Sequence, residues 1–290
     1  MPRVQEKAKI LESHREAEGI YRLVLYAPKI VPTARPGQFV MVRVASEGAD
    51  PLLARPFSFY RLHKDDGLCE ILLRVVGTGT RLLTRRTPGS SVDVVGPLGR
   101  GFTAPTSSEE TVVFVAGGIG IAPLRALLDH VLATTHKNHP ERLHLYYGAR
   151  SAGELIALHA LQRAGVVTVV STDDGSAGEA GTVLDAMRKR WEASAQMPNR
   201  LYACGSLPMQ VNVARWIRGR NILVEMSLES MMACGIGACL GCALPAVDPE
   251  APHEPRYLHV CQDGPVLDPR RIQWDKLQPV MARPLTFMSL

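Results

Sequence analysis

The sequence has no long apolar segment. Its hydrophobic residues, 46% of the total, occur in short runs, and none approaches the roughly 20 consecutive apolar residues that a membrane-spanning helix requires. The N-terminal stretch 1–16 is charged and broken by polar residues, so it lacks the apolar centre of a signal peptide. We therefore expect a soluble cytoplasmic protein and no membrane partner.

Long runs of one charge are also missing. The 33 basic and 28 acidic residues are interspersed, and the formal net charge is +5. Interspersed charge does not produce the concentrated basic surface that binds nucleic acids, so no nucleic-acid partner is expected. With 290 residues, the chain is long enough to fill two or three separate cores.

Cysteine is scarce and unevenly distributed. Without a secretory signal, the six cysteines are expected to be reduced thiols or metal ligands rather than disulfides. Cys69 alternates within an apolar strand and is expected to be a small core residue. Cys204 also stands alone. The remaining four lie together near the C-terminus, and four is the number of ligands in a closed metal site: Cys234, Cys239, Cys242 and Cys261.

The spacing Cys234-x4-Cys239-x2-Cys242, followed by Cys261, is typical of plant-type [2Fe-2S] ferredoxins. A [4Fe-4S] site usually has ligands at two-residue intervals, a zinc ribbon presents two separate cysteine pairs, and a Rieske centre needs two histidines. These alternatives, and inert cysteines, suit the pattern less well. The glycines between the ligands are expected to adopt the positive φ angles with which a loop can wrap a cluster: Gly235, Gly237 and Gly241.

The hydrophobic pattern divides the rest of the chain. Short apolar runs separated by Pro and Gly turns predict a small antiparallel barrel, with strands at 21–26, 38–44, 68–76 and 91–95. A linker-like stretch, 104–110, follows. Alternating strand-like and helix-like segments then predict a parallel sheet covered by helices, with segments at 111–116, 123–134, 142–148, 154–164, 166–171, 183–191, 201–204, 209–218 and 223–226. Three histidines around the first helix are expected to be solvated: His130, His136 and His139.

A glycine turn follows the first strand of the predicted sheet. Gly117, Gly118 and Gly120 stand between that strand and a helix, where glycine lets the backbone approach a pyrophosphate and the helix N-terminus supplies N–H donors. The spacing differs from that of the GxGxxG fingerprint, so a tight strand-to-helix turn without a ligand is the alternative.

Four motifs in order along the chain resemble those of the ferredoxin-reductase superfamily: Arg55-Pro56-Phe57-Ser58, 74–80, 117–123 and 204–209. With the C-terminal cysteine loop, the chain from Tyr21 to Asp268 resembles the electron-transfer subunits of the two-subunit, NAD-linked dihydroorotate dehydrogenases. This resemblance implies a FAD-binding β-barrel domain at 1–104, a Rossmann-like NAD-binding domain at 105–226 and a [2Fe-2S] domain at 227–290.

The resemblance also implies a flavin site. Arg55 would face the FAD pyrophosphate, a role that suits its planar donors, and Ser58 would lie near the flavin ring. Further positions in matching motifs are Pro56, Phe57, Leu72, Leu73, Arg74, Gly79 and Thr80, the last two as backbone and hydroxyl donors. For either arginine alone, the alternative is a surface ion pair.

The nicotinamide side of the family is matched by Gly117, Gly118, Gly120, Cys204 and Gly205. Cys204 would lie close to the nicotinamide, unless it is simply a buried cysteine that ends a strand. An acidic residue after a strand, such as Asp173, favours the ribose hydroxyls of NAD, whereas Arg150 favours the 2′-phosphate of NADP. The choice between the two dinucleotides stays open, with NAD preferred.

The cysteine loop departs from the family at one place. The interval between Cys242 and Cys261 is longer than in these subunits, with 248–255 as the apparent insertion. Cys261 is still expected to be the fourth ligand, because 259–265 resembles the final cysteine segment of the family. The tail 270–290 receives no assignment.

A flavin exchanges electron pairs with a nicotinamide and single electrons with an iron–sulfur cluster, which is a physical reason for three cofactors on one chain. No catalytic acid or base is expected here. The resemblance implies a heterotetramer with an FMN-containing dihydroorotate dehydrogenase subunit, which oxidises dihydroorotate in pyrimidine biosynthesis. Two alternatives are a diaphorase-type subunit of another enzyme, such as a hydrogenase, a sulfide dehydrogenase or a ferredoxin reductase, and a passive iron–sulfur carrier.

Overall fold

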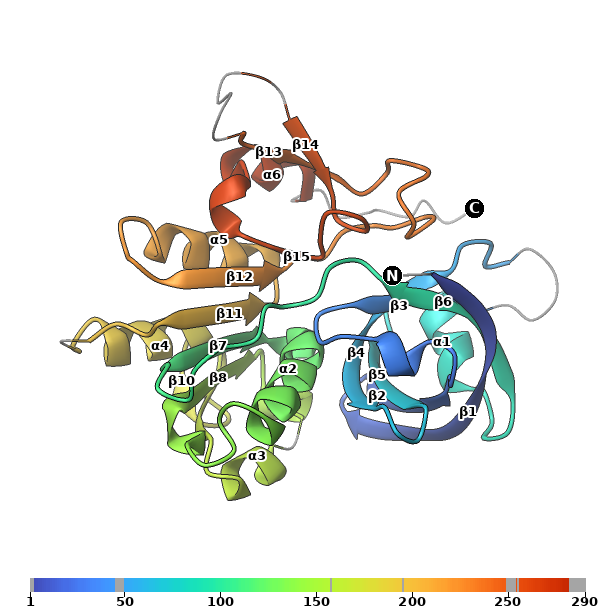
Figure 1. The fold of residues 1–290 in the computed structure, drawn as a ribbon, viewed down its shortest axis with the longest axis horizontal. Coiled ribbons are helices and arrows are strands. Elements are labelled where there is room, and N and C mark those ends of the chain that lie inside the picture. Colours follow the sequence, from blue (N-terminus) through green and yellow to red (C-terminus); the bar gives the residue numbers. More distant parts are fainter. Residues whose placement is uncertain are drawn as a thin grey trace.

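The computed structural model describes residues 3–44, 50–156, 158–194, 196–248, 254 and 256–281. A β-barrel, a parallel sheet flanked by helices and a small C-terminal segment lie side by side, and the C-terminal segment contacts both of the other parts (Figure 1). The predicted architecture, an antiparallel β-barrel followed by a Rossmann-like parallel sheet and a small C-terminal domain, is confirmed.

The barrel is closed by six antiparallel strands in the order β1-β2-β5-β4-β3-β6. A short helix, α1 (Thr78–Thr84), connects the fifth strand to the sixth. Each of the six strands contributes apolar side chains to one core inside the barrel. The strands are β1 (Val4–Ala17), β2 (Ile20–Tyr26), β3 (Phe39–Arg43), β4 (Arg55–His63), β5 (Leu68–Arg74) and β6 (Ser91–Leu98).

Two barrel strands were not predicted. Strand β1 is fourteen residues long, but only Ala8 and Ile10 are buried in it, so most of its side chains are polar and the strand lacks an apolar pattern. Strand β4 begins with Arg55 and Pro56, which the sequence identified only as a cofactor motif. Cys69 is buried in the barrel core, as predicted.

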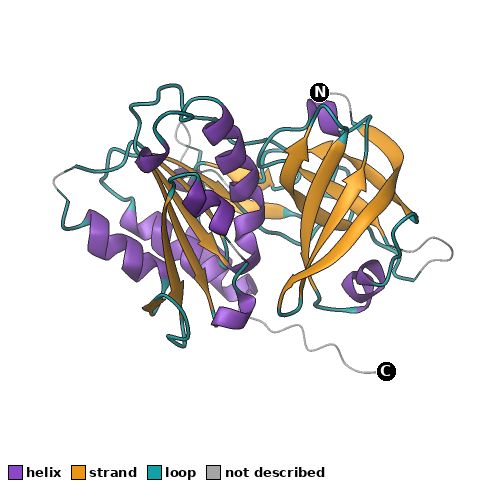
Figure 2. Ribbon diagram, turned by 90° about the horizontal axis from the view of Figure 1, so that it is seen from below, coloured by secondary structure: helices purple, strands orange, loops and turns teal. Residues whose placement is uncertain are grey.

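The second part is a sheet in the order β10-β9-β8-β7-β11-β12-β15. All pairs are parallel except that of β12 with β15. Strand β7 shows why these strands are apolar throughout: Val112 and Phe114 face one core and Val113 and Val115 another, because helices cover both faces of the sheet (Figure 2). The strands are β7 (Val112–Gly117), β8 (Leu143–Ala149), β9 (Val167–Thr172), β10 (Glu179–Ala180), β11 (Arg200–Cys204) and β12 (Leu223–Ser227).

Three of the four predicted helices lie close to their expected positions: α2 (Ile121–Ala133), α4 (Val183–Trp191) and α5 (Leu207–Trp216). The helix expected at 154–164 is shorter, because α3 covers only His159–Arg163. The prediction that His136 is solvated was wrong. Its side chain is fully buried, and Nε2 lies 2.9 Å from the carbonyl oxygen of Glu110, which compensates for the lost hydration.

The C-terminal segment contains a two-stranded hairpin, β13 (Ala243–Ala246) and β14 (Arg256–His259), followed by β15 (Val266–Leu267) and α6 (Trp274–Met281). Most of the predicted insertion, 249–253 and 255, and residues 282–290 of the tail lie outside the described residues. Within the described parts of the chain, none of the helices combines the length and the apolar character needed to cross a membrane.

Candidate functional site

A cavity of about 820 Å³ lies between the barrel and the carboxyl edge of the parallel sheet. Strands β4 and β5 form its barrel side, and the ends of β7, β8, β11 and β12 form its other side. Strands β8 and β9 lie on one side of β7, and the later strands β11 and β12 lie on its other side. The strand order therefore reverses between β7 and β11. Doubly wound sheets bind dinucleotides at such a point.

The predicted flavin and nucleotide residues converge on this cavity. All of them line it except Gly79 and Gly120. Gly79 packs against Arg55, since a Cβ atom there would lie 3.3 Å from Nε of the arginine. Gly120 allows the turn after β7 to pack against the end of β11, since a Cβ atom would lie 2.3 Å from the carbonyl oxygen of Cys204. Gly120 therefore has a packing role whether or not a ligand is bound.

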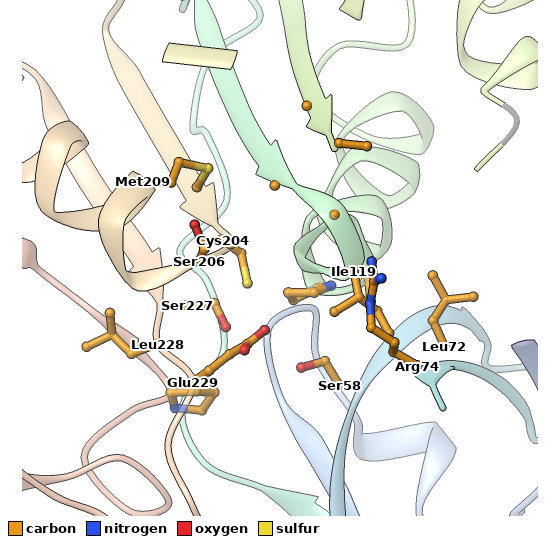
Figure 3. A pocket seen from close by; sticks show the side chains of 18 of the residues that line it. Ser58, Leu72, Arg74, Ile119, Cys204, Ser206, Met209, Ser227, Leu228 and Glu229 are labelled. Atoms are coloured by element: carbon orange, nitrogen blue, oxygen red, sulfur yellow. The ribbon is translucent and has the colours of Figure 1, made fainter. Parts of the chain in front are cut away.

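The two predicted flavin arginines differ in their partners. Arg55 donates a hydrogen bond from Nη1 to the carbonyl oxygen of Leu53 at 2.7 Å, and no carboxylate among the described residues pairs with it. Arg74 extends from the barrel to Glu154, in the short turn that follows β8, with 3.3 Å between Nη2 and Oε2. Arg74 is therefore part of an ion pair, which was the alternative to a flavin contact. This ion pair lies in the wall of the cavity and not on the outer surface (Figure 3).

The hydroxyl group of Thr80 is already engaged. It accepts hydrogen bonds from the backbone N–H groups of Val76 at 3.0 Å and Gly77 at 3.3 Å, and it donates to the carbonyl oxygen of Gly77. This arrangement orders the start of α1. The predicted role of Thr80 as a hydroxyl donor to flavin is thus less favoured than a role for backbone N–H groups in the first turn of the helix.

Cys204 ends β11, is buried, and lines the cavity near Ser227 and Glu229 (Figure 3). Burial, reinforced by the Glu229 carboxylate, raises the pKa of the thiol far above its ordinary value. Cys204 is therefore a neutral thiol at physiological pH, which suits packing against a ligand ring better than nucleophilic chemistry.

Two cavity carboxylates were missed by the sequence analysis. Glu229 follows β12 and faces the cavity (Figure 3); desolvation raises its pKa, and the charge of Arg74 opposes this effect. Glu154 belongs to a short turn after β8. An acidic residue that closely follows a buried strand, the signal used for Asp173, would have identified Glu229 but not Glu154.

The four clustered thiols form two pairs. Cys234 interacts with Cys239, and Cys242 with Cys261. Backbone N–H groups point at the sulfur atoms: those of Ile236 and Cys239 lie 3.4 Å from Sγ of Cys234. Among the described residues, no group of three or more His, Cys, Asp or Glu side chains is arranged to hold a single metal ion.

The loop geometry suits a cluster with several sulfur atoms. Gly235 and Gly237 have positive φ angles, as predicted, but Gly241 does not, and Leu240 has the positive φ instead. Although desolvation acts in the opposite direction, N–H donors lower the pKa of the Cys234 thiol to about 6. Peptide N–H groups directed at thiolates are the environment that iron–sulfur clusters require, so these residues fit such a group.

The cysteine loop and the cavity share a wall. Pro265 lines the cavity, and its carbonyl oxygen accepts a hydrogen bond at 2.9 Å from the N–H group of Leu228, another cavity residue. The buried thiols of Cys242 and Cys261 belong to the same core as Phe39 of the barrel. The cysteine loop and the cavity are therefore supported by one continuous core.

Comparison with known proteins agrees with this arrangement. Three family models match successive parts of the chain: an oxidoreductase FAD-binding domain at 3–102, an oxidoreductase NAD-binding domain at 114–215, and the iron-sulfur cluster binding domain of dihydroorotate dehydrogenase B at 229–273. Fold and site together define an NAD-linked flavin and iron–sulfur oxidoreductase subunit with a ferredoxin-reductase fold.

Close relatives identify the family. The dihydroorotate dehydrogenase B (NAD(+)) electron transfer subunit of Desulforamulus reducens is 36% identical over 272 residues, which are 92% of this chain and 98% of the relative. The same subunit of Geobacillus thermodenitrificans is 38% identical, over 90% of this chain and 96% of the relative. The chain belongs to the family of dihydroorotate dehydrogenase B electron transfer subunits.

Solved structures show the same fold. The structure of an NADH-dependent reduced ferredoxin-NADP oxidoreductase superposes with a TM-score of 0.79 at 27% identity, and the match covers 97% of this chain and 94% of the other. The ferredoxin reductase of carbazole 1,9a-dioxygenase has a TM-score of 0.66 at 18% identity, over 78% and 69% of the two chains, which shows the common fold alone.

Proposed function

We propose that this chain carries electrons from an FMN-containing dihydroorotate dehydrogenase catalytic subunit, through a [2Fe-2S] cluster and FAD, to NAD⁺. The observation that carries the proposal is the wall shared by the cysteine loop and the cavity. Electron transfer between two redox groups requires them to be close and fixed, and one continuous core supports both sites here.

The cavity residues supply binding and orientation. FAD, when bound, exchanges a hydride with NAD and single electrons with the cluster. Arg55 would hold the FAD pyrophosphate, because its guanidinium is not paired with a described carboxylate and can bind phosphate through two parallel hydrogen bonds. Ser58 and Cys204 line the cavity and would contact the flavin ring and the nicotinamide, respectively. The glycine turn after β7 receives the NAD pyrophosphate.

A docking face for the catalytic subunit surrounds the cysteine loop. Met231, Ile236 and Leu240 expose 75%, 37% and 58% of their surface, and Cys239 is the most exposed of the four ligands. Apolar side chains gathered at an exposed redox loop are typical of protein interfaces. We infer that the FMN subunit covers this face and that two copies of each chain form a heterotetramer.

Reconstitution tests the proposal. The isolated chain, with FAD and two irons, should oxidise NADH with artificial dyes but should not oxidise dihydroorotate. Addition of the FMN subunit should allow dihydroorotate to reduce NAD⁺. Cys239→Ser should stop that transfer but keep most of the NADH-to-dye activity, which needs only the flavin. An inactive mixture in which both subunits hold their cofactors would reject dihydroorotate as the electron source.

A second candidate is a diaphorase-type subunit of another enzyme. It is favoured by the similarity to the NADH-dependent reduced ferredoxin-NADP oxidoreductase, which covers 97% of this chain. The reconstitution separates the two, because a diaphorase subunit would transfer electrons to a different partner and not accept them from dihydroorotate. A passive iron–sulfur carrier is not supported, since a carrier needs neither the FAD-binding nor the NAD-binding domain.

A further inference from the structure

A charged corner of the cavity lies at the carboxyl ends of β8 and β9. It is formed by Arg150, Glu154 and Asp173. The N–H group of Asp173 donates a hydrogen bond to the carbonyl oxygen of Ala149 at 3.0 Å, which holds the two strand ends side by side. In doubly wound folds, an acidic residue binds the ribose 2′-hydroxyl of NAD, and an arginine nearby accommodates the 2′-phosphate of NADP. Both residue types are present here.

The carboxylate of Glu154 accepts hydrogen bonds from two guanidinium groups. Arg150 donates a hydrogen bond from Nη2 to Oε1, and Arg74 donates from its own Nη2 to Oε2 at 3.3 Å. The Glu154 side chain is only 11% exposed, whereas that of Arg150 is 75% exposed. The hydrogen bond from Arg150, supported by Arg74, keeps the pKa of Glu154 below its usual range. Glu154 is therefore ionised at neutral pH and fixed between two arginines.

Arg150 faces two further carboxylates. After Glu154, both Glu18 and Asp173 contribute to raising the pKa of its guanidinium. Three carboxylates, those of Glu154, Glu18 and Asp173, against the two guanidinium groups of Arg150 and Arg74 leave no excess positive charge at this corner. A phosphate monoester carries roughly 1.5 to 2 negative charges at neutral pH, so a 2′-phosphate would meet repulsion here instead of an available cation.

We propose that Glu154 is a positioning residue that makes the site select NAD(H) over NADP(H). It does so by holding Arg150, whose planar donors would otherwise suit a 2′-phosphate, and by neutralising its charge. The inference rests on the proposed nucleotide function of the cavity and adds the residue that sets its specificity. It also resolves the conflict between Arg150 and Asp173, since an arginine engaged by Glu154 no longer competes with Asp173.

The test is the binding of NAD⁺ and NADP⁺ to the full chain loaded with FAD, measured by isothermal titration calorimetry. Glu154→Gln should lower the ratio of the NADP⁺ Kd to the NAD⁺ Kd by about tenfold or more, because a released guanidinium gains a charge-assisted hydrogen bond to the phosphate. Glu154→Gln combined with Arg150→Gln should restore the wild-type ratio. Glu141→Gln, which removes an exposed carboxylate from the opposite edge of the sheet, is the matched control and should change nothing.

Each outcome decides the proposal. An unchanged ratio in Glu154→Gln, or a lowered ratio that persists without Arg150, would overturn it, and a ratio that responds only to Asp173→Asn would assign specificity to Asp173 alone. If Glu154→Gln does not fold, Glu154→Asp replaces it: the shorter side chain cannot reach both arginines, so the ratio should fall by a smaller factor that Arg150→Gln cancels. Wild-type protein that binds neither dinucleotide would reject the proposed function itself.

Discussion

Gly235→Ala should release the cluster while leaving the flavin in place. Gly235 has a φ of +70°, and a Cβ atom there would lie 2.4 Å from Cγ and 2.7 Å from Sδ of Met41 in β3. An alanine in the left-handed region costs about 1–2 kcal/mol, and overpacking against a barrel strand adds about 1–3 kcal/mol. The sum, roughly 2–5 kcal/mol, acts on a loop whose order is coupled to its metal group.

Iron and acid-labile sulfide, measured per FAD, report the outcome. Both should fall in Gly235→Ala. Gly241→Ala is the matched control: its φ is not positive, and its Cβ atom would lie 3.6 Å from Sγ of Cys239, an ordinary contact. Combining Gly235→Ala with Met41→Ala should recover part of the cluster, because the overpacking is relieved while the backbone strain remains. Full iron content in Gly235→Ala, or an equal loss of iron in Gly241→Ala, would contradict this prediction.

Three further predictions concern single side chains. Arg55→Ala should weaken FAD retention by an order of magnitude or more while the cluster stays, because charge-assisted hydrogen bonds worth roughly 1.5–3 kcal/mol each are lost; full flavin occupancy on dilution would contradict this. Cys261→Ser should remove or destabilise the cluster and Cys69→Ser should not, as judged by iron content and the electron paramagnetic resonance spectrum; an unchanged spectrum in Cys261→Ser would mean a different fourth ligand. In cluster-free protein, Cys234, whose pKa is lowered to about 6, should be mostly thiolate at pH 7 and should lose its reactivity toward iodoacetamide as the pH falls below 6. Cys204, whose pKa is raised, should stay unreactive. Mass spectrometry identifies the labelled cysteines, and labelling of Cys204 before Cys234 would contradict this prediction.

The parts of the fold that could be predicted are those with a local pattern. The strands of the parallel sheet are apolar on both faces, so they are recognisable without their neighbours. Cys234, Cys239 and Cys242 lie in one loop, so their spacing alone predicts a role as cluster ligands. Strand β1 gave no such signal, because only Ala8 and Ile10 of its fourteen residues are buried, and two buried positions are too few to show an alternating pattern.

Contacts between distant residues could not be predicted. Arg74 and Glu154 are 80 positions apart, and their pairing depends on how the barrel packs against the sheet. His136 is buried for a similar reason, since its partner is the backbone of Glu110, which the fold brings beside it. The sequence identified most of the residues around the cavity, but not which charges are already compensated by neighbours.

The pairing of β15 with β12 determines how such chains can be recombined. A chain cut after Ser227 would lose the strand that pairs with Met226 and Ser227, and β12 would become an edge strand with unpaired N–H and C=O groups. It would also lose Pro265 from the cavity wall. C-terminal segments of homologous chains can therefore be exchanged only as a unit that includes β15. This unit extends beyond the cysteine motif.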